Sequence, residues 1–142
     1  MIGTWKGLYK YDDKNIPKIT GFEFTYFTIQ ITEFDGRSFN GIVTDDAETG
    51  GMHGTGTIDG NVDLSNIYFE KRMEIRYTIN TITKTRKISN AAHPIIVYKG
   101  ELNVDQTAGR GTWKIRSKIR LLWGFIPVRL GGTGTWQMTK VN

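Results

Sequence analysis

The tripeptide Gly-Thr-Trp stands near both ends of this chain and occurs once more between them. The copies begin at Gly3, Gly111 and Gly134, and they hold three of the four tryptophans. A small residue before a large aromatic one is typical of a strand that another backbone approaches closely. The same signature at both termini predicts that the first and last strands meet, which closes a sheet into a barrel.

Segments rich in Thr, Ile, Val, Phe and Tyr, the residues preferred in strands, fill most of the chain. Turn signals separate them, among them Asp35-Gly36, Asp59-Gly60, Gly50-Gly51 and Ala108-Gly109. No segment keeps a helical apolar period; we expect one helical turn at 89–93 and the longest loop at 12–21. The expected strands are 3–11, 22–34, 37–46, 52–60, 62–71, 73–84, 95–105, 110–120, 121–129 and 132–140.

This pattern predicts an all-β fold, a single antiparallel up-and-down β-barrel of eight to ten strands, with a β-sandwich as the alternative. The chain of 142 residues is long enough for one domain with a real core, and we assign 1–142 to it. The absence of cysteine excludes disulfides and thiol chemistry. The first residues show neither a basic nor an apolar leader segment, which predicts a cytoplasmic protein unless a leader has been removed.

Strand alternation indicates which side chains face the interior. In the first strand it turns Trp5, Tyr9 and Tyr11 to one face and Lys6 and Lys10 to the other. The inward aromatic residues are candidate ligand contacts, with core filling as the alternative interpretation. The three repeated tryptophans are expected to plug one end of the barrel, which leaves the tyrosines and the opposite mouth for a ligand. The candidate set is Trp5, Tyr9, Tyr11, Phe39, Trp113 and Trp136.

A strand-initial Gly-x-Trp on an antiparallel meander resembles the calycin superfamily, which includes lipocalins and avidins. Gly3, Thr4 and Trp5 take the position of the lipocalin motif, in which the tryptophan plugs one barrel end. The resemblance implies that Arg129 or Lys140 packs over Trp5. It further implies a cup for a small, largely apolar molecule. No Thr-Asp-Tyr motif and no helix before the final strand are found, and the polar biotin contacts of avidins have no counterpart.

Charge is unevenly divided along the chain. Residues 1–70 carry five Lys/Arg against eleven Asp/Glu, a net charge of −6, whereas 71–142 carry fourteen against three, a net charge of +11. Basic side chains alternate outward along one expected strand, which is typical of a phosphate-binding or membrane-binding face, or of a strand kept soluble. That strip consists of Lys114, Arg116, Lys118 and Arg120, and a second cluster consists of Lys84, Arg86 and Lys87.

Three further patterns indicate candidate chemistry or contact surfaces. Asp45 and His53 face each other if a hairpin turns near Thr49, which would orient a general base or contribute to a metal site. The alternative interpretation is a solvated acidic hairpin. The apolar stretch 121–128 is either a flap or a buried strand pair. The run 22–34 is apolar on both faces, which indicates a bulge or a homodimer contact.

Together these patterns favour a binding protein that holds a small apolar or amphipathic molecule, oriented by Tyr9 or Tyr11, without metal or cofactor. The alternatives are an interaction module that binds nucleic acid or an anionic membrane through its basic face, and an enzyme with its site in the barrel mouth.

Overall fold

The computed structural model describes residues 1–51, 54–73, 76–80, 85–89, 95–116, 120–123, 126–129 and 132–141. Within these ranges the side chains are described as well, except at 19–20, 76–80, 85–89, 120–123 and 126–129. Eight antiparallel strands close into one up-and-down barrel in the order β1-β12-β9-β8-β5-β4-β3-β2. The predicted fold class is thereby confirmed, and the β-sandwich is excluded. The barrel strands are β1 (Gly3–Tyr11), β2 (Thr25–Phe34), β3 (Ser38–Asp45), β4 (Thr55–Asp63), β5 (Asn66–Met73), β8 (Ile96–Leu102), β9 (Ala108–Ile115) and β12 (Thr133–Lys140).

The barrel closes through its first and last strands, as the repeated tripeptide predicts. β1 runs antiparallel to β12, with Trp5 opposite Lys140 and Tyr11 opposite Gly134. Of the two basic residues that the calycin resemblance offers as partners for Trp5, Lys140 is thus its cross-strand neighbour. Full closure leaves no sheet edge at this seam to pair with another chain.

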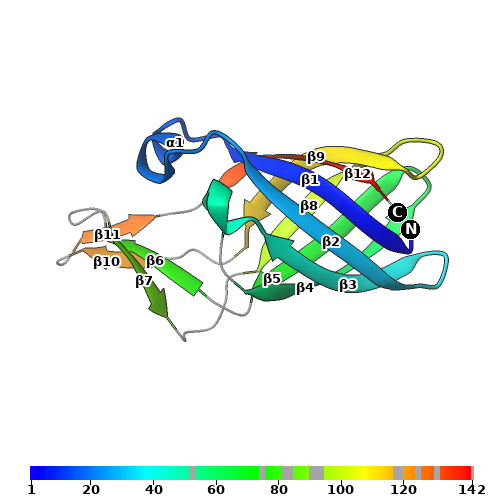
Figure 1. The fold of residues 1–142 in the computed structure, drawn as a ribbon, viewed down its shortest axis with the longest axis horizontal. Helices are drawn as coiled ribbons and strands as arrows, with labels where there is room; N and C mark the ends of the chain where they lie inside the picture. Colours follow the sequence, from blue (N-terminus) through cyan, green and yellow to red (C-terminus); the bar gives the residue numbers. More distant parts are fainter. Residues whose placement is uncertain are drawn as a thin grey trace.

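The two ends of the barrel differ (Figure 1). At one, the turn end, lie both termini and the short connections 35–37, 64–65 and 103–107. At the other, the loop end, β1, β3, β5 and β9 finish and the longer connections begin. These connections carry α1 (Asn15–Thr20), the 3₁₀ turn η1 (Ala47–Thr49), and two hairpins beyond the barrel, β6 (Arg76–Asn80) with β7 (Thr85–Ser89) and β10 (Arg120–Trp123) with β11 (Ile126–Arg129).

Several predicted elements need correction. The segments 73–84 and 121–129, each expected as one strand, contribute to the hairpins β6–β7 and β10–β11. The loop expected at 12–21 contains α1, which is capped after its last residue by Gly21 with a left-handed φ of 81°. The helical turn expected at 89–93 begins at the last residue of β7, and its remainder lies outside the described residues.

Two predicted turns lie inside strands. Asp59-Gly60 belongs to β4, and Ala108-Gly109 belongs to β9. A Cβ at Gly60 would lie 2.3 Å from the carbonyl oxygen of Tyr68 and 2.5 Å from Cβ of Phe69. Glycine is therefore needed at this position because β5 packs closely against it. The Asp-Gly pair, which is also typical of a turn, does not distinguish the two roles.

Alternation along the barrel strands buries one face of each and exposes the other. In β1, Trp5 is 0% and Tyr9 8% exposed, while Lys6 and Lys10 lie on the outside. The interior of the described barrel is filled by apolar and aromatic side chains in mutual contact. Its core consists of Trp5, Tyr9, Phe27, Ile29, Ile31, Phe39, Val43, Ile58, Val62, Ile67, Phe69, Met73, Tyr98, Leu102, Trp113, Trp136 and Met138.

The segment 22–34 has two apolar faces, as the sequence indicates. Phe27 and Ile29 face the core, whereas Phe24 and Tyr26 lie outside and are 38% and 52% exposed. The pairing of β2 with β3 shifts register between Ile31 and Glu33, which is consistent with the predicted bulge. The homodimer contact stays a prediction.

Candidate functional site

The three repeated tryptophans do not form one plug. Along β12, Trp5 lies opposite position 140 and Trp113 opposite position 134. Six residues of strand correspond to about 20 Å, so these two rings lie toward opposite ends of the barrel. Trp136 lies between them on β12 itself. The expectation of a stacked plug is therefore wrong, because alternation fixes the face of a side chain but not its height in the barrel.

Each of these tryptophans is tied to the backbone by its indole N–H. The Nε1 of Trp5 donates to the Met1 carbonyl at 2.9 Å, and that of Trp113 donates to the Lys10 carbonyl at 3.2 Å. The Nε1 of Trp136 donates to the carbonyls of Lys99 and Thr112 at 3.2 and 3.0 Å. Their rings are buried and their indole N–H groups already have acceptors. These residues therefore stabilise the barrel, and they have no free donor to offer a polar ligand.

The six candidate aromatic residues fall into separate groups. Tyr9, Tyr11 and Trp113 meet edge to face toward the loop end, at centroid distances of 4.9 to 6.1 Å. Phe39 and Trp136 both contact Phe69, at 6.1 and 5.6 Å. Trp5 has no ring contact among the described residues. All six nevertheless belong to one core cluster or pack against it, and the three rings in direct mutual contact lie at the loop end.

A buried ion pair lies beside this group. Nζ of Lys71 is 2.6 Å from Oδ1 of Asp45, and both side chains are only 3% exposed. The hydroxyl of Tyr9 donates to Oδ2 of the same carboxylate at 3.3 Å, and the ammonium lies 5.2 Å from the Tyr9 ring centroid. Since burying an ion pair among apolar side chains costs several kcal/mol per ion, this cluster is unusual for a barrel core.

Asp45 is placed by the end of β3 and by the segment that follows. It continues the inward alternation of Phe39 and Val43. The chain then folds back: the Asp46 N–H donates to the Tyr26 carbonyl at 2.8 Å, and a Cβ at Gly51 would lie 2.5 Å from Cβ of Asp45. The returning segment therefore covers the carboxylate, and only a glycine fits against it.

The hairpin pattern indicates Asp45 as a candidate residue, whereas its partner Lys71 is not among the predicted site residues. The interior face of β5 reads Ile67, Phe69, Lys71 and Met73, so the same alternation that located the aromatic residues would have turned Lys71 inward. His53, the partner expected for Asp45, lies outside the described residues.

Tyr98 adds a second buried hydroxyl to the site. Its ring stacks on Phe69 at 4.6 Å, and the residue is 3% exposed. Burial raises the pKa of Tyr98 well above its ordinary value of 10.0, and the charges of Asp45 and Tyr11 raise it further. Within the described part of the chain, its hydroxyl has no hydrogen-bond partner. Burial, followed by the Asp45 charge, likewise raises the pKa of Tyr9.

Half-buried apolar side chains stand around the cluster at the loop end. Ile96 lies opposite Lys71 across β5 and β8, and opposite Ile115 across β8 and β9. Tyr11, Ile96 and Ile115 pack against the core while remaining partly accessible. We call these three residues the apolar rim. The loop end therefore combines an apolar rim with a buried polar floor.

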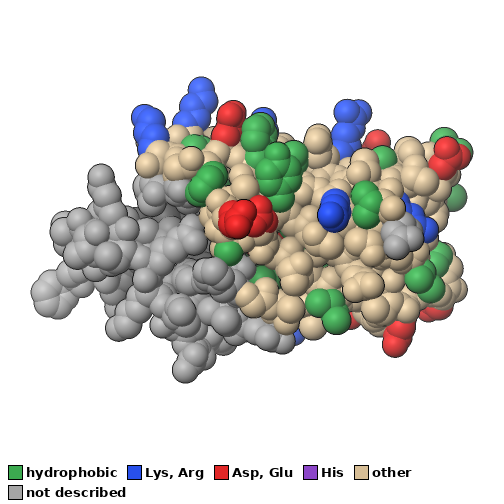
Figure 2. Space-filling view, in the orientation of Figure 1, with side chains coloured by type: hydrophobic (Ala, Val, Ile, Leu, Met, Phe, Trp, Pro, Cys, Tyr) green, Lys and Arg blue, Asp and Glu red, His purple; other side chains and the backbone are tan. Residues whose placement is uncertain are grey.

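The predicted basic strip is only partly described. Lys114 and Arg116 point outward from the end of β9, as expected, whereas the side chains of Lys118 and Arg120 lie outside the described part. The Arg116 guanidinium forms an ion pair with Glu70 and donates to the Tyr68 hydroxyl at 3.0 Å. On the face shown in Figure 2, acidic and basic side chains are interspersed. Arg116 is therefore paired with an acidic residue of the barrel wall.

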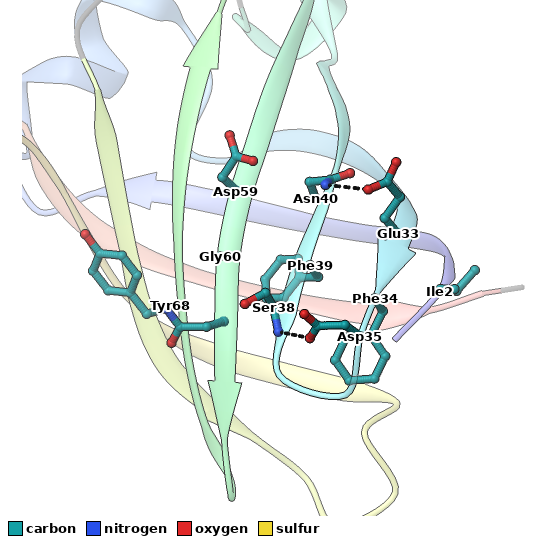
Figure 3. A pocket seen from close by; sticks show the side chains of 11 residues that line it. Ile2, Glu33, Phe34, Asp35, Ser38, Phe39, Asn40, Asp59, Gly60 and Tyr68 are labelled. Carbon is teal, nitrogen blue, oxygen red and sulfur yellow. Dashed lines mark hydrogen bonds between the residues drawn. The ribbon is translucent and has the colours of Figure 1, made fainter.

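Hollows on the outside of the barrel carry less chemistry. One of about 760 Å³ lies beside the β2–β3 turn (Figure 3). Two of its carboxylates serve local hydrogen bonds: Asp35 accepts from the backbone N–H of Ser38 at 2.7 Å, and Glu33 accepts from the side chain of Asn40 at 3.1 Å. Among the described residues, no group of three His, Asp or Glu is placed to hold a metal ion.

Comparisons with protein-family models, with curated proteins and with solved structures gave no match to this chain. The closed antiparallel meander is consistent with the calycin architecture at the level of topology. In the described part of the chain, no helix is both long and apolar enough to cross a membrane.

Proposed function

We propose that this protein binds a small amphipathic molecule at the loop end of its barrel. The apolar part of the ligand lies against the apolar rim, and its polar group reaches the Lys71–Asp45 pair and the neighbouring tyrosines. Tyr11 contacts the ligand, and Tyr9 holds the carboxylate in place. The buried ion pair is the single observation that carries this proposal.

Two physical arguments support it. Replacing a buried ion pair by well-packed apolar residues of similar volume is often neutral or stabilising, so a core gains little stability from keeping one. Ionisable groups held in a dry environment next to accessible apolar surface are instead a common feature of binding sites. The long connections that start at this end are where ligand access is expected in a small barrel.

The experiment is a titration with straight-chain alcohols, followed by tryptophan fluorescence. Trp113 should respond because its ring lies 4.9 Å from that of Tyr11. Each buried methylene contributes about 0.8 kcal/mol, so affinity should rise about fourfold per carbon from octanol to decanol. Native mass spectrometry of the purified protein would show whether a ligand is carried from the cell.

A matched pair of variants locates the site. Tyr11→Ala removes a ring from the apolar rim, whereas Tyr26→Ala removes one from the outer face of β2, where it is 52% exposed. Decanol binding should weaken at least tenfold in the first variant and stay unchanged in the second. If both variants bind decanol like the wild type, the site is not at the loop end and the proposal is wrong.

A further inference from the structure

We infer that this site selects a ligand whose polar group is an uncharged oxygen, such as an alcohol or a ketone, over the corresponding carboxylate. The inference rests on the proposed function and specifies the ligand's chemistry. It is drawn from two features of the polar floor: its charge balance and its unused hydrogen-bond donors.

Among the described residues, the charges of the polar floor balance one another. The Lys71 ammonium and the Asp45 carboxylate are 2.6 Å apart, and neither is accessible enough for water to screen it. A carboxylate ligand would bring a second negative charge to the one ammonium that the described residues place in this dry environment. An unpaired buried charge is strongly unfavourable, and a neutral head group avoids that cost.

Among the described residues, the floor has hydrogen-bond donors without an acceptor. An ammonium has three N–H groups, and in the described part of the chain Asp45 is the one hydrogen-bond partner of Lys71. The Tyr98 hydroxyl likewise lacks a partner among the described residues, although the residue is 97% removed from solvent. Native proteins rarely leave a buried hydroxyl without a partner, and none of the described residues supplies one to Tyr98, which supports a ligand atom in that place.

The two donors belong to the same wall of the barrel. Lys71 pairs with Ile96 and Phe69 pairs with Tyr98, so the lysine and the tyrosine are diagonal neighbours on the interior face of β5 and β8. Both are linked to Asp45: the lysine contacts its carboxylate directly, and the carboxylate charge helps to raise the pKa of the Tyr98 phenol after burial does. One ligand oxygen entering past Ile96 could accept from either donor without displacing the carboxylate.

The test compares 1-decanol with decanoate by isothermal titration calorimetry at pH 7.5. Wild-type protein should bind decanol at least tenfold more tightly. Any apolar pocket would favour the alcohol to some degree, so two variants make the result specific. Tyr98→Phe should weaken decanol binding about fivefold, the value of one hydrogen bond, while Tyr26→Phe on the outer face should leave it unchanged. Asp45→Asn leaves Lys71 uncompensated and should strengthen decanoate binding at least tenfold.

The outcomes separate the inference from the proposal beneath it. Equal or tighter binding of decanoate by the wild type, or an unchanged decanol affinity in Tyr98→Phe, would overturn the inference and leave the binding site standing. Failure of both compounds to bind would overturn the proposed function as well. If Asp45→Asn does not fold, the wild-type and Tyr98→Phe titrations decide the matter.

Discussion

The ammonium of Lys71 lies 2.6 Å from the carboxylate of Asp45 inside a barrel that is otherwise filled by apolar and aromatic side chains. The two residues are 26 positions apart in the chain and come from strands separated by β4. Their meeting is thus a product of barrel closure, and it gives the loop end a polar floor.

Breaking the pair should destabilise the protein more than any nearby surface change. Lys71→Met leaves Asp45 buried without a counter-charge, which costs about 3–5 kcal/mol of unfolding free energy. Arg72→Met changes the next residue, whose side chain is 58% exposed, and should cost less than about 0.5 kcal/mol. Urea denaturation of both variants measures the difference. Equal stabilities would show that the pair is solvated in solution.

Glycines on the inner face of β9 offer a second test. A Cβ at Gly111 would lie 1.8 Å from the Lys99 carbonyl oxygen, so Gly111→Ala forces the backbones of β8 and β9 apart and should cost about 3 kcal/mol. At Gly109 the nearest atom is a side-chain carbon of Leu102 at 3.0 Å, which can yield. Gly109→Ala should therefore cost about 1 kcal/mol. Thermal unfolding ranks the two variants, and the reverse order would contradict the packing described.

Removing the Tyr98 hydroxyl should not destabilise the ligand-free protein. Because it lacks a partner among the described residues, Tyr98→Phe should leave the ligand-free protein at least as stable as the wild type at pH 7. Tyr9→Phe removes the donor to Asp45 and should cost about 1 kcal/mol. Chemical denaturation checks both. A loss of more than about 1 kcal/mol in Tyr98→Phe would mean that the hydroxyl is bonded in the folded protein.

Alkaline pH should destabilise the barrel through the same tyrosines. Burial raises the pKa of Tyr9 and Tyr98 in the folded state, so the unfolded chain loses these protons first as pH rises. Stability from this source is complete below the ordinary value of 10.0 and is lost above it, at about 1.4 kcal/mol per pH unit for each tyrosine. Tyr98→Phe should lose stability less steeply between pH 10 and 11. Identical slopes would contradict the burial of that phenol.

The sequence predicted the fold better than it predicted the site. Alternation in β1 and β9 turned Tyr9 and Trp113 inward, and the tripeptide at both ends indicated closure. Both signals are local, because the face of a side chain follows from its neighbours in the strand.

What the sequence could not provide was the relation between distant strands. The register of β12 against β1 and β9 decides that Trp5 and Trp113 lie at different heights, and nothing in either tripeptide encodes it. Lys71 was not predicted to face inward, although the alternation of residues along β5 places it on the interior face, since a lysine in a strand is ordinarily exposed. Gly60 was misread because a turn and a close strand contact both demand glycine.

A crystal structure of the protein with 1-decanol tests the central claim most directly. If the protein binds the alcohol as proposed, electron density will lie at the loop end, with the alkyl chain against Tyr11, Ile96 and Ile115. The alcohol oxygen should lie about 3 Å from Nζ of Lys71 or from the hydroxyl of Tyr98. Density confined to the outer face of the barrel, with the Lys71–Asp45 pair and its surroundings unchanged, would contradict it.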